Sequence, residues 1–278
     1  MTNPNYKTPL RVSVSSWALH PLLNRAYPGR PGDPDGTMFE NKGDAPLTLL
    51  EVPAHLAELG IHTMELCHFH LPSRDALYLA EFQEALKSAD VELWSLLIDE
   101  GDLAHPEHHA RDFKWVKEWV DTAKTLGAKH ARIIAGKQPP TPQNLALSRD
   151  ALSHLADYVE GSGLRLFTEN WFALLPTAEV LNPFLESLEG RVGLCFDFGN
   201  WSGDSKYEEL TKIAHLAESC HAKCFFGENA LPNRDDFLRC IEITRNADFS
   251  GPYTLVAADA EDVWGTIAVQ RDLLLSTF

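Results

Sequence analysis

Apolar positions along the chain follow two periods. Short apolar runs of strand length recur eight times, and a longer segment with the three-to-four-residue spacing of an amphipathic helix follows each of them. The clearest helical segment is residues 106–127, where one apolar stripe comprises Phe113, Val116, Val120, Ala123 and Leu126. The strand-like runs are residues 10–17, 61–67, 91–98, 129–135, 164–170, 191–198, 220–226 and 252–258.

Strands that alternate with helices predict an α/β fold with a parallel sheet. Eight such units in 278 residues fit a closed (β/α)8 TIM barrel, in a single domain over residues 1–278. An open doubly wound sheet would usually carry a glycine-rich GxGxxG loop after its first strand, and the sequence has none there. Residues 20–46 are rich in Pro, Gly, Asp and Asn and follow the first strand, which predicts a lid loop over the barrel mouth.

Charge narrows the choice of partners. The formal net charge is -16, which disfavours binding to nucleic acid or to anionic lipid and leaves a small molecule as the expected partner. The five cysteines include no CxxC pair, and Cys195 falls in an apolar run where a cysteine usually acts as a small hydrophobe. With neither a signal-peptide pattern nor an apolar run that could span a bilayer, we expect a cytoplasmic protein without a membrane partner.

Polar residues at the ends of three successive predicted strands are the candidate chemistry. Glu169 ends the fifth strand, Asp197 ends the sixth, and His221 and Lys223 point the same way on the seventh. Taken singly, Glu169 could be a solvated or paired carboxylate, Asp197 a turn cap and His221 a core histidine. Together at one end of a barrel, carboxylates and an imidazole suit Mn2+, Mg2+, Co2+ or Zn2+.

Further residues at or near strand ends are candidates for substrate contacts. His68 has the alternative of a surface-loop histidine, and Arg132 could pair with a core carboxylate or hold a substrate oxygen. Tryptophans there could form aromatic walls or belong to the core. The candidate substrate-binding residues are Trp17, Glu65, His68, Arg132, Trp171 and Asn200.

The chain resembles the xylose isomerase-like barrel superfamily, in particular its sugar phosphate isomerase/epimerase branch, over nearly its whole length. The resemblance implies a divalent metal held by Glu169, Asp197, His221 and a glutamate on the eighth strand. The segments that carry it are MELCHFH, LLIDEGDLAHP, LGAKHARIIAG, LFTENW, CFDFGNW, CHAKCFF and FSGPYTL.

The sequence departs from the family pattern on the eighth strand. Val256 occupies the usual place of the glutamate, and Asp259 or Glu261 in the following loop could replace it. In family epimerases that glutamate is a ligand and one of two acid/base groups, so the metal could be weakly held or absent. Asn200 stands where abasic-site endonuclease relatives have a histidine, which argues against that activity.

These features predict a metal-dependent isomerase or epimerase of a small sugar, polyol or sugar acid. Glu169 would abstract a proton beside a carbonyl, the metal would stabilise an ene-diolate, and Lys223 would neutralise the oxyanion or act as a second acid. A related lyase, such as a keto-inositol dehydratase, would use the same residues. A sugar-binding barrel that has lost catalysis is the alternative that Val256 suggests, and a homo-oligomer stays open.

Overall fold

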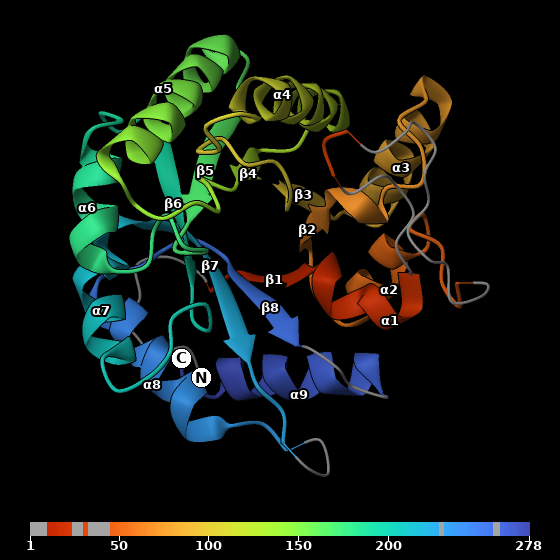
Figure 1. Cartoon of the computed structure of the whole chain (residues 1–278). Coiled ribbons are helices and arrows are strands. Elements are labelled where there is room, and N and C mark those ends of the chain that lie inside the picture. Colours follow the sequence, from red (N-terminus) through yellow and green to blue (C-terminus); the bar gives the residue numbers. More distant parts are fainter. Residues whose placement is uncertain (1–9, 24–29, 33–44, 228–230, 258–261) are drawn as a thin grey trace.

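The eight strands form one closed parallel barrel in which each strand pairs with its neighbours in the sequence (Figure 1). The structure is a computed structural model that describes residues 10–23, 30–32, 45–227, 231–257 and 262–278. It confirms the predicted (β/α)8 TIM barrel. The strands are β1 (Val12–Ser15), β2 (Thr63–Cys67), β3 (Glu92–Ile98), β4 (His130–Ile133), β5 (Arg165–Glu169), β6 (Val192–Asp197), β7 (Ala217–Cys224) and β8 (Tyr253–Ala257).

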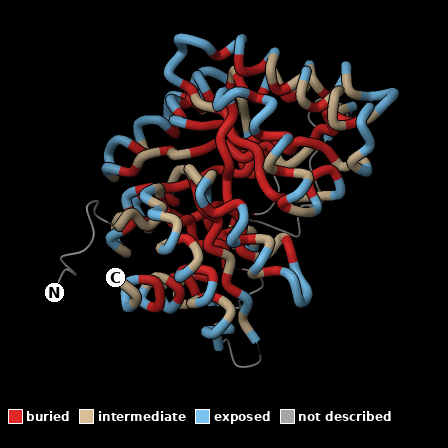
Figure 2. The backbone as a smooth tube through the Cα atoms, turned by 90° about the vertical axis from the view of Figure 1, so that its left-hand side faces the viewer, coloured by how far each residue is buried: buried red, intermediate tan, exposed pale blue. Residues whose placement is uncertain are grey.

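Helices surround the barrel, and the strands at the centre of the molecule are the most deeply buried (Figures 1 and 2). The segment predicted as a helix over residues 106–127 is helical from His109 to Leu126, and Gly127 closes it with a φ of 74°. The helices are α1 (His20–Leu23), α2 (Val52–Glu58), α3 (Ala76–Ser88), α4 (His109–Leu126), α5 (Pro142–Val159), α6 (Ala178–Glu186), α7 (Lys206–Ile213), α8 (Arg234–Asn246) and α9 (Val263–Leu275).

The strand register decides which side chains meet inside the barrel. Side chains alternate between the two faces of a strand, so every second residue points inward. Glu169 pairs in register with Cys195, and Asp197 pairs with His221. The barrel therefore brings the ends of β5, β6 and β7 together on its inner side.

The predicted lid falls mostly outside the described residues. Within residues 20–46, His20 to Leu23 form the short helix α1 and not a loop, because the 3-10 turn Ser16–Leu19 runs directly into it. The remaining described positions are 30–32, 45 and 46. Asp259 and Glu261, the proposed replacements for the missing glutamate, also lie outside the described residues. Among the described helices, none has the length and apolar character needed to cross a membrane.

Candidate active site

A cavity of about 110 Å³ opens at the carboxyl ends of the strands, where (β/α)8 barrels place their functional groups. Residues of the inner strand faces and of the loops that follow line it. They are Ser15, Trp17, Cys67, Leu97, Asp99, Arg132, Glu169, Trp171, Asp197, Asn200, His221, Lys223 and Val256.

Glu169 is 3% exposed, and two polar side chains orient its carboxylate. Asn200 Nδ2 donates a hydrogen bond of 2.7 Å to its Oε1. Arg132 Nε lies 3.1 Å from Oε2, close enough for an ion pair but not aligned for a hydrogen bond, so Oε2 is buried without a hydrogen-bond partner among the described residues. Oε1 of Glu169 is thus hydrogen-bonded, whereas Oε2 lies beside the Arg132 guanidinium with its hydrogen-bonding capacity unused among the described residues.

Arg132 is the buried cation beside that carboxylate. It forms an ion pair with Asp99, and its guanidinium lies 5.2 Å from the centre of the Trp171 ring. Burial opposes its charge, but the neighbouring Asp99 and Glu169 outweigh burial and raise the pKa of Arg132. Arg132 was expected either to pair with a core carboxylate or to hold a substrate oxygen. The structure contains the carboxylate pairing, and Arg132 also lines the cavity.

Asp197 is 1% exposed and uses its two oxygens differently. Oδ1 accepts backbone hydrogen bonds from Gly199 at 2.6 Å and Asn200 at 2.7 Å, which makes Asp197 a turn cap. Oδ2 lies 3.4 Å from Lys223 Nζ. Burial disfavours the carboxylate, but the Lys223 charge and further hydrogen bonds lower the pKa of Asp197 below its ordinary value.

His221 lies among three carboxylates. Its Nε2 is 2.8 Å from Glu65 Oε2, and its Nδ1 is 3.3 Å from Glu169 Oε1 and 3.6 Å from Asp197 Oδ2. Burial disfavours the imidazolium, but the acidic groups around it outweigh that effect and raise the pKa of His221 well above its ordinary value. With Nε2 on Glu65, Nδ1 is the ring nitrogen that faces Glu169 and Asp197.

Lys223 lies at the edge of the same group. Its Nζ donates a hydrogen bond of 3.1 Å to Asn200 Oδ1. Gly199 leaves room for its stem, because a Cβ there would lie 2.5 Å from Lys223 Cδ. On β8, Val256 pairs in register with Lys223 and contributes only hydrocarbon to the cavity.

Two of the candidate substrate residues do not line the cavity. Glu65 is fully buried beneath His221. His68 begins the 3-10 turn His68–His70, which directs its ring against Trp115 and Trp119 on the side of α4. The other candidates, Trp17, Arg132, Trp171 and Asn200, all line it.

Sequence reasoning missed two ionisable residues at or next to the site, Asp99 and Cys195. Asp99 follows β3 directly and pairs with Arg132. Its position just after an apolar run is the sequence signal that could have identified it as a site residue. Cys195 precedes Asp197 by two residues and therefore shares its inward face. Burial raises the pKa of the Cys195 thiol to about 12.

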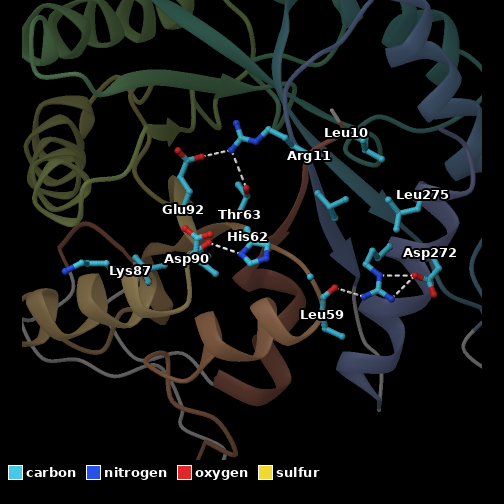
Figure 3. A pocket seen from close by; sticks show the side chains of 15 residues that line it. Leu10, Arg11, Leu59, His62, Thr63, Lys87, Asp90, Glu92, Asp272 and Leu275 are labelled. Carbon is cyan, nitrogen blue, oxygen red and sulfur yellow. Dashed lines mark hydrogen bonds and ion pairs between the residues drawn. The ribbon is translucent and has the colours of Figure 1, made fainter. Parts of the chain in front are cut away.

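A larger hollow of about 770 Å³ opens at the opposite end of the barrel, at the starts of β1, β2 and β3 (Figure 3). Its polar groups bond to one another: Arg11 lies 2.5 Å from Glu92, and His62 Nδ1 is 2.9 Å from the carbonyl of Asp90. Arg271 likewise contacts Asp272. We place the candidate active site in the smaller cavity, because its charged groups converge on one buried point.

Comparison with known proteins identifies the class of fold. Residues 53–254 match the family described as xylose isomerase-like TIM barrel. The chain therefore belongs to this family. A search of curated protein sequences gave no match.

Solved structures with the same fold cover almost the whole chain. A xylose isomerase-like TIM barrel protein from Mycobacterium smegmatis, in complex with magnesium, has 15% identity and a TM-score of 0.67, with 96% of each chain covered. D-allulose 3-epimerase from Methylomonas sp. has 13% identity and a TM-score of 0.68, over 98% of this chain and 99% of the other. 3-Keto-D-glucoside 4-epimerase from E. coli has 16% identity and a TM-score of 0.65, over 85% of this chain and 97% of the other.

Proposed function

We propose that the protein is an epimerase or isomerase of a small keto-sugar or related polyol and moves a proton on a carbon next to a carbonyl. The observation that carries the proposal is the Glu169 carboxylate, which lines the cavity and whose Oε2, buried beside Arg132, has no hydrogen-bond partner within the described part of the chain. A carboxylate that is hydrogen-bonded on one oxygen and keeps its hydrogen-bonding capacity on the other suits a general base. The similarity in fold to two sugar epimerases supports the same class of substrate.

Six residues of the cavity have a role in this proposal. Glu169 takes the proton, while Asn200 and Arg132 keep its carboxylate in place. Lys223 Nζ stabilises the negative oxygen that develops on the substrate, or returns a proton to it. Trp17 and Trp171, on the loops after β1 and β5, cover the apolar faces of the sugar.

Part of the set of potential ligand atoms at this site suits a divalent metal. Glu169 Oε2 is buried and unsatisfied by any described residue, Asp197 Oδ2 lies 3.4 Å from Lys223 and 3.6 Å from His221, and His221 Nδ1 faces both carboxylates. These three residues would hold the ion. A bound ion would polarise the carbonyl and the adjacent hydroxyl of the substrate.

Solvent exchange tests the proposal whichever product forms. We expect the protein, incubated with Mn2+ and D-fructose, D-tagatose or D-allulose in D2O, to introduce deuterium beside the carbonyl of at least one sugar, as followed by NMR. Replacing Glu169 by Gln removes the base and should slow exchange by roughly 10²- to 10⁴-fold. Glu92→Gln, at the far end of the barrel, is the matched control and should exchange at the wild-type rate.

The second candidate is a sugar-binding barrel without catalysis, and Val256 in the cavity lining is the observation that favours it. Calorimetry separates the two. Binding of one of these sugars with no exchange in D2O would favour the second candidate and would contradict proton transfer by Glu169.

A further inference from the structure

The inner faces of β5, β6 and β7 bring a thiol into the group of potential metal ligands. Ligand atoms of Glu169, Cys195 and His221 all lie within 4.8 Å of one another, and all three residues are buried. Ligand atoms bound to one zinc ion are roughly 3 to 4 Å apart, since each lies about 2.0–2.3 Å from the metal. Small side-chain movements would therefore bring these three atoms onto one ion.

Register explains why Cys195 is so close. Cys195 and Glu169 are direct partners between β5 and β6, and both point into the barrel. Asp197 points the same way but lies one inward position nearer the cavity mouth. Its Oδ1 is already occupied by the backbone hydrogen bonds from Gly199 and Asn200. Only Oδ2 of Asp197 is therefore left to bind a metal ion, and the Cys195 thiol competes with it for the same ion.

The residue at the cavity on the eighth strand offers no ligand atom, so the Cys195 thiol forms a larger share of the potential metal ligands. Val256 supplies no donor atom at the place where the family resemblance implies a glutamate oxygen. A set made of one thiolate, one imidazole and one or two carboxylates is softer than a set of three carboxylates and one imidazole. Thiolate ligands select zinc and similar metals, whereas Mg2+ and Mn2+ prefer oxygen.

We propose that Cys195 is a metal ligand and that, together with Glu169 and His221, it makes this site selective for a thiophilic ion such as Zn2+ or Co2+. This inference rests on the metal site of the proposed function and specifies which metal that site takes. On binding, the Cys195 thiol loses its proton to solvent, and His221 binds through Nδ1 as a neutral imidazole whose Nε2 contacts Glu65. There is no change in oxidation state.

Cobalt provides a readout that does not depend on activity. Co2+ is added to the metal-free protein and the near-ultraviolet spectrum is followed, because a cobalt–thiolate bond gives a sulfur-to-metal charge-transfer band there. We expect the band in the wild type and in Cys67→Ser, which changes the cysteine that lines the cavity. We expect Cys195→Ser to lose it.

Competition with a chelator measures selectivity in the same variants. In Cys195→Ser, Zn2+ affinity should fall by roughly 10- to 100-fold, at least the loss seen when an outer-shell partner of a metal is removed. Mn2+ affinity should change by less than about threefold, since Mn2+ gains little from a thiolate. If Cys195→Ser does not fold, Cys195→Ala replaces it, and the wild-type band stands as a test by itself.

The outcomes separate this inference from the function on which it rests. Two results would overturn the assignment of Cys195 and leave the metal site standing. In the first, the wild type binds cobalt without the charge-transfer band. In the second, the band is still present in Cys195→Ser and Cys195→Ala. No binding of cobalt, zinc or manganese would overturn both the assignment and the metal-dependent part of the proposed function. Proton transfer by Glu169 is judged separately, by exchange in D2O.

Discussion

Asp197 has a structural role that two substitutions can separate from its chemistry. Its Oδ1 accepts hydrogen bonds from the backbone N–H groups of Gly199 and Asn200 and so fixes the turn after β6. Alanine removes both hydrogen bonds, whereas asparagine keeps an oxygen in the same place. Hydrogen bonds to charged groups contribute about 1.5–3 kcal/mol each. Because this turn is only partly buried, its N–H groups would regain water in the alanine variant, and we expect a total loss of about 2–4 kcal/mol.

The expected change in melting temperature follows from chain size. A loss of 1 kcal/mol lowers the midpoint by about 2 °C in a domain of this size, so Asp197→Ala should melt about 4–8 °C below the wild type. Asp197→Asn should stay within about 3 °C of the wild type, since it loses charge but keeps the acceptor. Thermal unfolding is followed by circular dichroism with a chelator present, which removes any contribution from bound metal.

Either of two results would contradict this reasoning. If Asp197→Ala had the melting temperature of the wild type, the two hydrogen bonds would add nothing to stability. An asparagine variant that melts as low as the alanine variant would mean that the negative charge, paired with Lys223 at 3.4 Å, and not the turn, stabilises the end of β6.

The remaining predictions concern the cations and carboxylates of the same cavity. Arg132→Met leaves Asp99 buried without its partner and should cost about 3–5 kcal/mol in urea unfolding, and an unchanged midpoint would contradict the pairing. Gly199→Ala places a Cβ 2.5 Å from Lys223 Cδ and should displace the lysine, so that exchange in D2O slows at least about tenfold while the melting temperature falls by less than about 3 °C. The pKa values of Asp99 and Asp197 are lowered in the folded protein, so the stability they give is present above pH about 4 and is lost as pH falls below it. Urea midpoints measured from pH 6 to pH 3 should fall in the wild type, and less so in Asp197→Asn.

The barrel itself follows from the sequence, because most of its strands are largely apolar runs that are buried on both faces. The prediction is least accurate at β7, which begins at Ala217 and not at Cys220. The residues left out of the predicted strand include Glu218 and Ser219, whose polarity hides its start. Ser219 points inward and donates a hydrogen bond to Glu65, so the polar residue belongs to the barrel interior.

The candidate site is predicted less fully than the fold. Glu169 and Asp197 were found because each is a polar residue at the end of an apolar run, and His221 because it shares a strand face with Lys223 on the next predicted strand. Cys195 was interpreted as a small hydrophobe, although the period of two from Asp197 places it on the inner face. His68 was expected at the cavity, and only the turn geometry after β2 directs it away.

Val256 and Lys223 are best understood as a pair. They are register partners on adjacent strands, and both line the cavity, so their side chains lie on the same face about 5 Å apart at the backbone. A glutamate at position 256 would stand beside the Lys223 ammonium and compete for it with Asp197. Valine leaves the lysine free to hold Asp197 and Asn200 instead. Valine at this position therefore leaves no competing anion beside Lys223, and under the proposed function the ammonium is the cation that would stabilise a negative substrate oxygen.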